Sequence, residues 1–592
     1  MRRIGIVLAT VVAVTAATLV SAPPSVGAPP PITRAGCGWQ AEMSQANPPS
    51  AIRGGVLSLP KYAPVSMPLA GDVNWLADPY HDPTWRLWFH SLKWMEGLVR
   101  TGDPADMALA RAIVTDFVKD NPDPGTNTGA WVDHATSLRT SLLVCMWEQG
   151  DADLRAWIEP IIAAHTGVLV GRWVGLWNHG LMQNLALLGA GCTMNVPAWR
   201  TTASARLDAG VRASVDAQGA MNEQGLGYVP FIQSLLREVV VHLEGCGMPV
   251  PAGVATRVAA LDLFAAEATR PNGTFVEVGD TYPVAPGAEM GPYSAWVSSG
   301  GAEGRRPAAT TKVYGAGWIF GRDSWVRTAQ QYSLRFGPGR WVHGHNDHLS
   351  MTYWAQGRDV LVDAGFSGYA DADYRDWQRS PQAHNVPVVL GARFSNKAAT
   401  SLVGTSAGQG AHSFSLRDSA YAGAERFRTV LVDDAMRMML VRDDVTSGTP
   451  RALQVLWHLD PSWRAEHLFS SARSNRATFL SPDGRYRATV LQIAPAGTRM
   501  PNRAAKLVRG RTAPLQGFVA RGRGDRTPAW VVEARRPAAK RQSVVTLVVV
   551  TPVAQQVDAV WTHPHGADRI RVTVNGHVRV YDSTRRGGMS VH

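Results

Sequence analysis

The chain has little cysteine: four residues among 592, at positions 37, 145, 192 and 246. Their spacing matches no zinc-binding module. An even number of cysteines permits disulfides in an exported protein, with three possible connectivities. Cys192 and Cys246 each end a predicted helical segment. A bridge between those helices and a pair of buried free thiols are both compatible with this placement.

The sequence also lacks a second long apolar run beyond its N-terminus. Arg2 and Arg3 precede an apolar run from Ile4 to Val20, and small residues continue to Ala28. This order is typical of a secretory signal peptide, and the run is short for a membrane span. We therefore expect a signal peptide over residues 1–28, an N-terminal extension over 29–70, and a protein that is secreted to the extracellular space without membrane insertion.

No fixed-period repeat is present, which disfavours a solenoid. Apolar residues nevertheless recur at helical spacing from Pro83 to about Arg270, with Gly, Pro and Asp at the breaks. The predicted helical segments are Trp85–Leu98, Met107–Val118, His134–Trp147, Asp151–Leu169, Asn178–Leu188, Pro197–Val215, Phe231–Leu243 and Pro251–Ala268. Paired helices without a sequence repeat favour a closed α/α toroid, which we assign to residues 71–300.

Beyond residue 311 the segments become short, β-rich and separated by turn residues. Predicted strands are Val313–Arg322, Gln331–Phe336, Leu349–Gln356, Val360–Asp363, Val386–Leu390, Met438–Arg442, Leu453–Leu459, Val544–Val550 and Ile570–Val580. Helices followed by strands predict an α+β multidomain fold, an N-terminal α/α toroid followed by a C-terminal antiparallel β-sandwich over residues 301–592.

Acidic residues are in deficit. There are 59 Lys and Arg against 47 Asp and Glu, a formal charge of +12 that remains +10 without Arg2 and Arg3. An excess of positive charge favours a polyanionic partner. No pattern indicates nucleic-acid binding, and the sequence does not fix the oligomeric state.

The stretch from Trp341 to Ser350 holds three histidines and an aspartate. If this stretch is a strand, His343, His345 and Asp347 share one face, because side chains alternate with period two. A turn at Gly357–Arg358 folds Asp363 back beside His345, and His384 precedes the next apolar strand. Two imidazoles and a carboxylate form a zinc-type ligand set. A hydrogen-bonded network without metal is the alternative.

Three further clusters lie in the helical half. Asn178 and His179 start a helix beside Trp173 and Trp177, tryptophans that suit sugar faces; a capped helix with core tryptophans explains them equally well. Tyr228 follows a Gly-rich turn and could serve in acid–base chemistry, although most such tyrosines only pack. The segment 271–280, which ends in Asp280, is interpreted as structural.

Together these features resemble the heparinase II/III-like polysaccharide lyases over most of the mature chain. The most specific matches are His343-Gly-His-Asn-Asp347, Asp363-Ala-Gly365, Tyr369 and Ser380-Pro-Gln-Ala-His384-Asn385. The resemblance implies a cleft between toroid and sandwich that binds an acidic polysaccharide. It also implies β-elimination, which needs a base for the proton beside a uronate carboxylate, donors for the developing charge, and an acid for the leaving oxygen.

The resemblance also implies individual roles. Asn178 and His179 lie at the substrate carboxylate, Tyr228 acts as general acid and His343 as partner base. A largely structural zinc ion is held by His345, Asp363 and His384, and Tyr369 and Tyr374 are candidate cleft tyrosines. Met182 stands where some family members carry a glutamate, which weakens a prediction of heparin-type specificity.

Two other functions stay open. An α/α-toroid glycoside hydrolase needs a pair of flanking carboxylates, for which Glu223 with Asp280 is the candidate pair. A non-catalytic protein that binds polyanionic glycans needs only the cleft and the basic surface.

Overall fold

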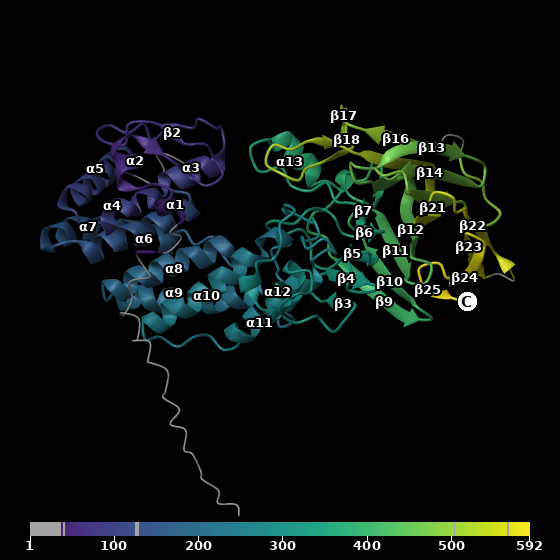
Figure 1. Cartoon of the computed structure of the whole chain (residues 1–592), viewed down its shortest axis with the longest axis horizontal. Helices are drawn as coiled ribbons and strands as arrows, with labels where there is room; N and C mark the ends of the chain where they lie inside the picture. Colours follow the sequence, from purple (N-terminus) through teal and green to yellow (C-terminus); the bar gives the residue numbers. More distant parts are fainter. Residues whose placement is uncertain (1–36, 39–41, 123, 125–128, 502–503, 565–566) are drawn as a thin grey trace, which may run out of the picture.

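The structure, a computed structural model, describes residues 37–38, 42–122, 124, 129–501, 504–564 and 567–592. The predicted signal peptide lies outside the described residues. Helices form the first part of the described chain and antiparallel sheets the second (Figure 1). Within the described residues, every helix is too short or too polar to cross a membrane.

The helical part agrees closely with the predicted segments. Its helices are α1 (Glu42–Gln45), α2 (Pro49–Arg53), α3 (Pro83–His90), α4 (Glu96–Arg100), α5 (Pro104–Asp120), α6 (Asp133–Gln149), α7 (Ala152–Gly171), α8 (Asn178–Thr193), α9 (Pro197–Ser214), α10 (Val229–Gly245), α11 (Val254–Glu267) and α12 (Pro292–Ser298). The predicted segment Trp85–Leu98 is wrong as a single helix. It breaks into α3 and α4 at Leu92, a buried residue in the left-handed conformation (φ 54°).

Local chemistry explains where several helices begin. The carboxylates of Asp82, Asp103 and Asp151 accept hydrogen bonds from backbone N–H groups in the first turns of α3, α5 and α7. Proline follows directly in α3 and α5, where its missing N–H costs nothing. Successive helices then pack side by side, α6 against α7 and α8, and α8 against α9 and α10.

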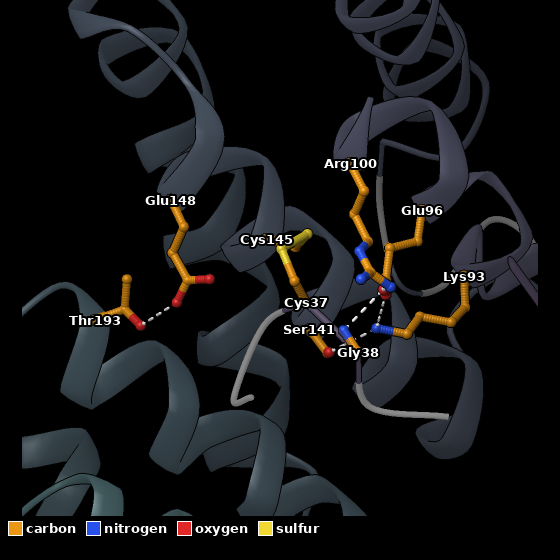
Figure 2. The surroundings of a disulfide bond; sticks show 9 residues. All are labelled: Cys37, Gly38, Lys93, Glu96, Arg100, Ser141, Cys145, Glu148 and Thr193. Atoms are coloured by element: carbon orange, nitrogen blue, oxygen red, sulfur yellow. Dashed lines mark hydrogen bonds and ion pairs between the residues drawn. A yellow bond between two sulfur atoms is a disulfide. The ribbon is translucent and has the colours of Figure 1, made fainter. Parts of the chain in front are cut away.

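Two disulfides tie this part together. Cys192–Cys246 joins the ends of α8 and α10, so of the two alternatives that the sequence left open the bridge is present. Cys37–Cys145 attaches the N-terminal segment to α6 (Figure 2). Beside it, the Gly38 N–H donates to Glu96 Oε1 at 2.7 Å, and Glu96 pairs with Lys93 in an ion pair that is fully buried on both sides.

The β part contains three larger antiparallel sheets. The five-stranded sheet has β3 (Thr311–Tyr314), β4 (Trp318–Arg322), β5 (Gln331–Arg335), β6 (Met351–Ala355) and β7 (Arg358–Leu361) in that order. The ten-stranded sheet contains β8 (Pro387–Val389), β9 (Thr400–Gly408), β10 (Ala411–Asp418), β11 (Ala424–Asp433), β12 (Met438–His458), β13 (Arg464–Ser470), β14 (Ser474–Leu480), β15 (Tyr486–Ile493), β16 (Ala505–Arg509) and β21 (Trp530–Pro552). The four-stranded sheet contains β22 (Val557–Thr562), β23 (Asp568–Val574), β24 (His577–Ser583) and β25 (Met589–Val591).

The ten-stranded sheet is the middle layer of three (Figure 1). Along β11 and β12, Val430 and Met439 pack toward the five-stranded sheet, whereas their neighbours Leu431 and Met438 pack toward the four-stranded sheet. Both faces of these strands are buried, so both sets of alternating positions are apolar. This burial explains why every residue of Val544–Val550, within β21, is apolar except Thr546.

The five-stranded sheet also forms the junction with the helices. Trp318 and Phe320 on β4 pack around Phe264 of α11, while Ile319 between them faces the large sheet. Strand β4 therefore contributes to the hydrophobic core of the helical part and to that of the β part. The loops that extend from this sheet lie next to the helical part.

Candidate functional site

The predicted strand at 341–350 is wrong, because this stretch is a loop that ends where β6 begins at Met351. Its backbone is anchored to the helical part. The His343 N–H donates to the Glu223 carbonyl at 3.0 Å, and the His343 carbonyl accepts from the Asp280 N–H at 2.9 Å. These backbone bonds replace those of a sheet neighbour, and they hold His343 at the junction.

Glu223 lies at the N-terminus of α8. Asn178 is the first residue of that helix rather than its N-cap, and both its backbone N–H (2.6 Å) and its side-chain Nδ2 (2.5 Å) donate to the Glu223 carboxylate. A carboxylate is favoured here by the free N–H groups of the first turn. Burial raises the pKa of Glu223, and His343 and Asn178 offset only part of that rise.

His343 lies between two carboxylates. Its Nδ1 is 3.2 Å from Asp280 Oδ2, while its Nε2 is 3.3 Å from Asn178 Nδ2 and 3.6 Å from Glu223 Oε2. A carboxylate at Nδ1 accepts the Nδ1–H proton, which leaves the Nε2 lone pair to accept from Asn178. The surroundings therefore select the tautomer in which Nε2 can take up a proton.

Tyr228 stacks on this imidazole. The ring centroids of Tyr228 and His343 lie 3.5 Å apart with an interplanar angle of 11°. The Tyr228 hydroxyl is 2.9 Å from the Tyr369 hydroxyl, which also lies 3.2 Å from Asp280 Oδ2 and 3.3 Å from His343 Nδ1. Burial, followed by the charge of Asp280, raises the pKa values of both tyrosines, so both hydroxyls stay protonated. With Tyr369 39% exposed, a ligand can reach this pair.

His179 extends the site toward α6. Its Nδ1 lies 2.8 Å from Asp133 Oδ2, and the Trp177 ring stacks on it with a centroid separation of 4.0 Å. Although burial raises the pKa of Asp133, His179 lowers it to a value below the usual one. His179, Asp133 and Trp177 thus form a partly exposed group beside Asn178.

Two predicted substrate residues lie outside the Tyr228–His343 contacts, Trp173 beside Gly180 of α8 and Tyr374 on a separate helix. Tyr374 is on α13 (Ala372–Gln378), only 1% exposed, and packs with Trp377 and Phe518 in a small apolar cluster. The Trp173 ring is covered by the Arg206 guanidinium at 4.8 Å. Neither contacts Tyr228 or His343 among the described residues, so a substrate role for either stays a prediction.

The predicted metal ligands are brought together. His345, Asp363 and His384 are buried, and one potential ligand atom from each lies within 4.8 Å of the others. His384 Nδ1 is 2.9 Å and His345 Nδ1 is 3.7 Å from the Asp363 carboxylate. Burial raises the pKa of Asp363, but the two histidines lower it well below its usual range.

Asp280 connects the two groups. Besides His343, it contacts His345 Nε2 at 3.1 Å and forms a buried ion pair with Arg375 at 2.5 Å. Burial raises the pKa of Asp280, and the histidines and Arg375 more than offset this, so the carboxylate is ionised. The interpretation of segment 271–280 as merely structural therefore misses a residue that orients both His343 and His345.

Glu223 and Arg375 were also missed as site residues. The sequence analysis named Glu223 only as half of a hydrolase pair. Glu223 lies 45 positions after Asn178, and no local pattern indicates that its carboxylate binds the N-terminus of the helix that Asn178 begins. Arg375 lies on a short helix of ordinary composition, and nothing in its neighbourhood distinguishes it from the other arginines of this chain.

Comparisons with known proteins identify the fold that holds this site. The sequence model of the family described as "Heparinase II/III-like, C-terminal" matches residues 328–573. No curated protein matches the chain in sequence. The crystal structure of heparinase III superposes with a TM-score of 0.74 at 17% identity, covering 92% of this chain and 91% of that one.

Two further solved structures share the fold. Heparan sulfate lyase HepC from Pedobacter heparinus has a TM-score of 0.62 at 17% identity, covering 90% of this chain and 88% of its own. Chondroitin AC lyase from Streptomyces coelicolor A3, solved with chondroitin sulphate, has a TM-score of 0.53 at 12% identity, covering 92% and 84%. The predicted fold class, a helical toroid followed by an antiparallel β-sandwich, is confirmed by these likenesses. Residues 328–573 thus match the heparinase II/III-like C-terminal family, and the chain as a whole shares the fold of heparinase III.

Proposed function

We propose that the protein is a secreted polysaccharide lyase that cleaves a uronate-containing acidic polysaccharide by β-elimination. The observation that carries this proposal is the group Asn178, Tyr228, His343 and Tyr369 at the junction of the two parts. An acid, a base and an amide converge there, and the tyrosine pair is open to solvent. These are the groups that the reaction requires.

In the proposed β-elimination, His343 accepts one proton and Tyr228 donates another. The uronate carboxylate takes over the Asn178 N–H that bonds to His343 Nε2, and Nε2 is then free to remove the proton from C5. Asn178 and His179 face the carboxylate and lower the cost of the developing charge. The C4–O bond then breaks, a C4–C5 double bond forms, and the protonated Tyr228 hydroxyl gives its proton to the leaving oxygen. The raised pKa of Tyr228 suits a donor and disfavours a standing phenolate.

Cationic side chains support an acidic substrate. Arg340 and Arg379 lie close enough to Arg375 for their charges to repel one another. Burial is the main cause that lowers the pKa values of Arg340 and Arg379, and this repulsion lowers them further. A substrate carboxylate or sulfate nearby relieves that repulsion.

A hydrolase that uses Glu223 and Asp280 is less compatible with this site. Both carboxylates are almost fully buried, and their partners are protein groups, Asn178 for Glu223 and Arg375 for Asp280. A glycosidase instead needs two carboxyl groups that flank the bond to be cleaved.

Product chemistry tests the proposal directly. Purified protein is incubated with heparan sulfate, chondroitin sulfate, hyaluronan, alginate and polygalacturonate while far-UV absorbance of the unsaturated product is recorded. A lyase produces this chromophore with at least one polymer. New reducing ends without the chromophore indicate a hydrolase, and binding without any new ends indicates a non-catalytic glycan-binding protein.

We further propose that His345, Asp363 and His384 hold one zinc ion with a mainly structural role. His345 Nδ1 is buried and has no hydrogen-bond partner among the described residues, although it points toward Asp363. Such an atom is costly unless a cation binds it. The separations of 2.9 and 3.7 Å also bracket the roughly 3.3 Å between ligand atoms of a tetrahedral zinc site.

Metal content separates the zinc site from the chemistry. Elemental analysis of purified protein should find about one zinc per chain, lost in His345→Ala and His384→Ala and retained in His343→Ala. A hydrogen-bonded network without metal predicts no zinc in any of the four proteins. Loss of zinc in His343→Ala as well contradicts the division of roles between His343 and His345.

We also propose that residues 1–28 are removed on export, so that the toroid (71–300) and the sandwich (301–592) follow a short N-terminal extension. N-terminal sequencing of the protein from the culture medium tests both points. A chain that retains Met1 inside the cell contradicts them.

A further inference from the structure

The two longest strands of the molecule bend together on the β part. Strands β12 and β21 pair along most of their length, but their register shifts between Thr446 and Arg451 and again before Leu453. Beside this bend lies a pocket of about 860 Å³. Its walls come from the β10–β11 loop, from the bends of β12 and β21, and from the β24–β25 turn.

Positive charge dominates the lining of this pocket. Lys540, Arg541, Arg585 and Arg586 line it, against Glu425 as the one acidic lining residue. Glu425 is already neutralised, because its carboxylate lies 2.7 Å from Arg586. The other three cations are exposed, and within the described part of the chain they form no ion pair. Strand β21 and the β24–β25 turn thus bring three uncompensated cations to one hollow.

The fold holds the turn that carries two of the arginines. The Arg586 backbone is in the left-handed conformation (φ 55°), its N–H donates to Asp444 Oδ2 at 3.2 Å, and its guanidinium donates to Thr446 Oγ1 at 2.5 Å. These bonds attach the β24–β25 turn to β12, and Arg585 next to it lines the same hollow. Arginine suits carboxylates and sulfates, whose oxygens accept two parallel N–H bonds.

The other lining groups favour a sugar over a nucleic acid. Ser419, Thr446 and Ser447 add hydroxyls that can bond to sugar hydroxyls. Tyr421 is the one aromatic lining residue, and it is 3% exposed, so its ring is closed to the stacking that single-stranded bases require. The volume lies within the range of pockets that take organic ligands, well above that of a single ion.

We propose that this pocket binds a short anionic saccharide segment, separately from the Tyr228–His343 site. No lining residue of the pocket belongs to that site, so binding here adds a second point of attachment for an acidic polymer. A polymer bound at both points dissociates more slowly than one bound at either alone.

The test uses the whole protein with size-defined dextran sulfate, which carries no uronate and undergoes no β-elimination. Titration calorimetry compares the wild type with the double variant Lys540→Ser, Arg541→Ser. Removing two charges from the pocket should weaken binding about tenfold at low salt, and the difference should shrink at high salt. Neutral dextran should bind to neither protein.

A matched control removes the same charge elsewhere. Arg473 and Arg571 are exposed, outside the pocket and in no ion pair among the described residues. The variant Arg473→Ser, Arg571→Ser should weaken binding less than twofold. An equal loss in both double variants, or no loss in the pocket variant, overturns the proposal. If the pocket variant binds single-stranded DNA tenfold more weakly but binds dextran sulfate as the wild type does, the pocket is a nucleic-acid surface and the saccharide proposal is overturned.

Further measurements separate this proposal from the catalytic one. Thermal unfolding verifies that the pocket variant is folded, and Arg585→Ser on the turn provides a second, independent variant that should also weaken binding. Cleavage of a short uronate oligosaccharide should be unchanged in both. If the protein cleaves no uronate polymer at all, the dextran sulfate result still decides whether the pocket binds polyanions.

Discussion

The helical and β parts of this molecule are held together by different means. All four cysteines lie in the helical part, where two disulfides join segments 108 and 54 residues apart. The β part has no cysteine, and its strands are joined by backbone ladders, above all between β12 and β21. Helices satisfy their backbone bonds internally, so only side chains and disulfides fix how they lie against one another.

The two parts also divide the site between them. The helical part supplies Asn178, His179 and Tyr228, whereas the loop before β6 supplies His343. The proposed zinc ligands all come from the β part. We therefore expect metal binding to depend on the β part and on Asp280, which orients His345, and catalysis to depend on the contact between the two parts.

The largest expected effect tests that contact. Tyr228→Phe removes the proposed proton donor from the helical part and should lower kcat by about 100- to 10,000-fold. Tyr374→Phe is the comparison variant. This tyrosine is buried among Trp377 and Phe518 and lies outside the proton path, so a cleft role would change KM, while kcat should stay within about twofold. Initial rates of product chromophore formation measure both. Full activity in Tyr228→Phe, or an equal loss in Tyr374→Phe, contradicts the assignment.

Removing disulfides tests the helical part. Cys37→Ser with Cys145→Ser should lower the free energy of unfolding by about 4 to 5 kcal/mol, because the unfolded chain regains the freedom of a long loop. The Cys192–Cys246 disulfide closes a loop half as long. The double variant Cys192→Ser, Cys246→Ser should therefore lose about 0.6 kcal/mol less unfolding free energy than the first double variant. Denaturant titrations of both double variants measure the values. A loss below about 1 kcal/mol in either variant indicates that packing alone holds these helices.

A buried ion pair tests the β part. Asp418→Asn leaves the Arg426 guanidinium, 2% exposed, without its carboxylate partner and should cost about 3 kcal/mol of unfolding free energy. The control is Asp208→Asn on α9, whose partner Arg212 is half exposed and whose loss should cost at most about 0.5 kcal/mol. Equal costs in the two variants contradict the view that burial makes the Asp418–Arg426 pair matter more than the exposed Asp208–Arg212 pair.

The pH dependence of the same pair should show a smaller effect. Burial raises the pKa of Asp418, but Arg426 more than offsets this, so the folded-state pKa is below the usual value. The resulting stability is present above the unfolded pKa of about 3.9 and is lost as pH falls through the folded pKa. Unfolding free energies at pH 5 and pH 3 should therefore fall more for the wild type than for Asp418→Asn. A parallel fall in the two proteins contradicts the prediction.

Much of the fold was readable from local pattern. The helices from α5 to α11 appear close to the predicted segments because their apolar spacing, prolines and aspartates act within a few residues. The hairpin that brings Asp363 beside His345 is confirmed for the same reason. The loop at 341–350 was mistaken for a strand, since its backbone partners are Glu223 and Asp280, far away in the sequence.

The sequence by itself determined the order of helices and strands, the export-like N-terminus, and the residue types that could carry acid–base and metal chemistry. Only the tertiary structure decided that three sheets are stacked, that Asp280 links His343 to His345, and that Glu223 holds the start of α8. Local pattern reports what a segment buries and how it turns. The partners of a buried carboxylate depend on packing between segments that lie tens to hundreds of residues apart, and no local pattern contains that information.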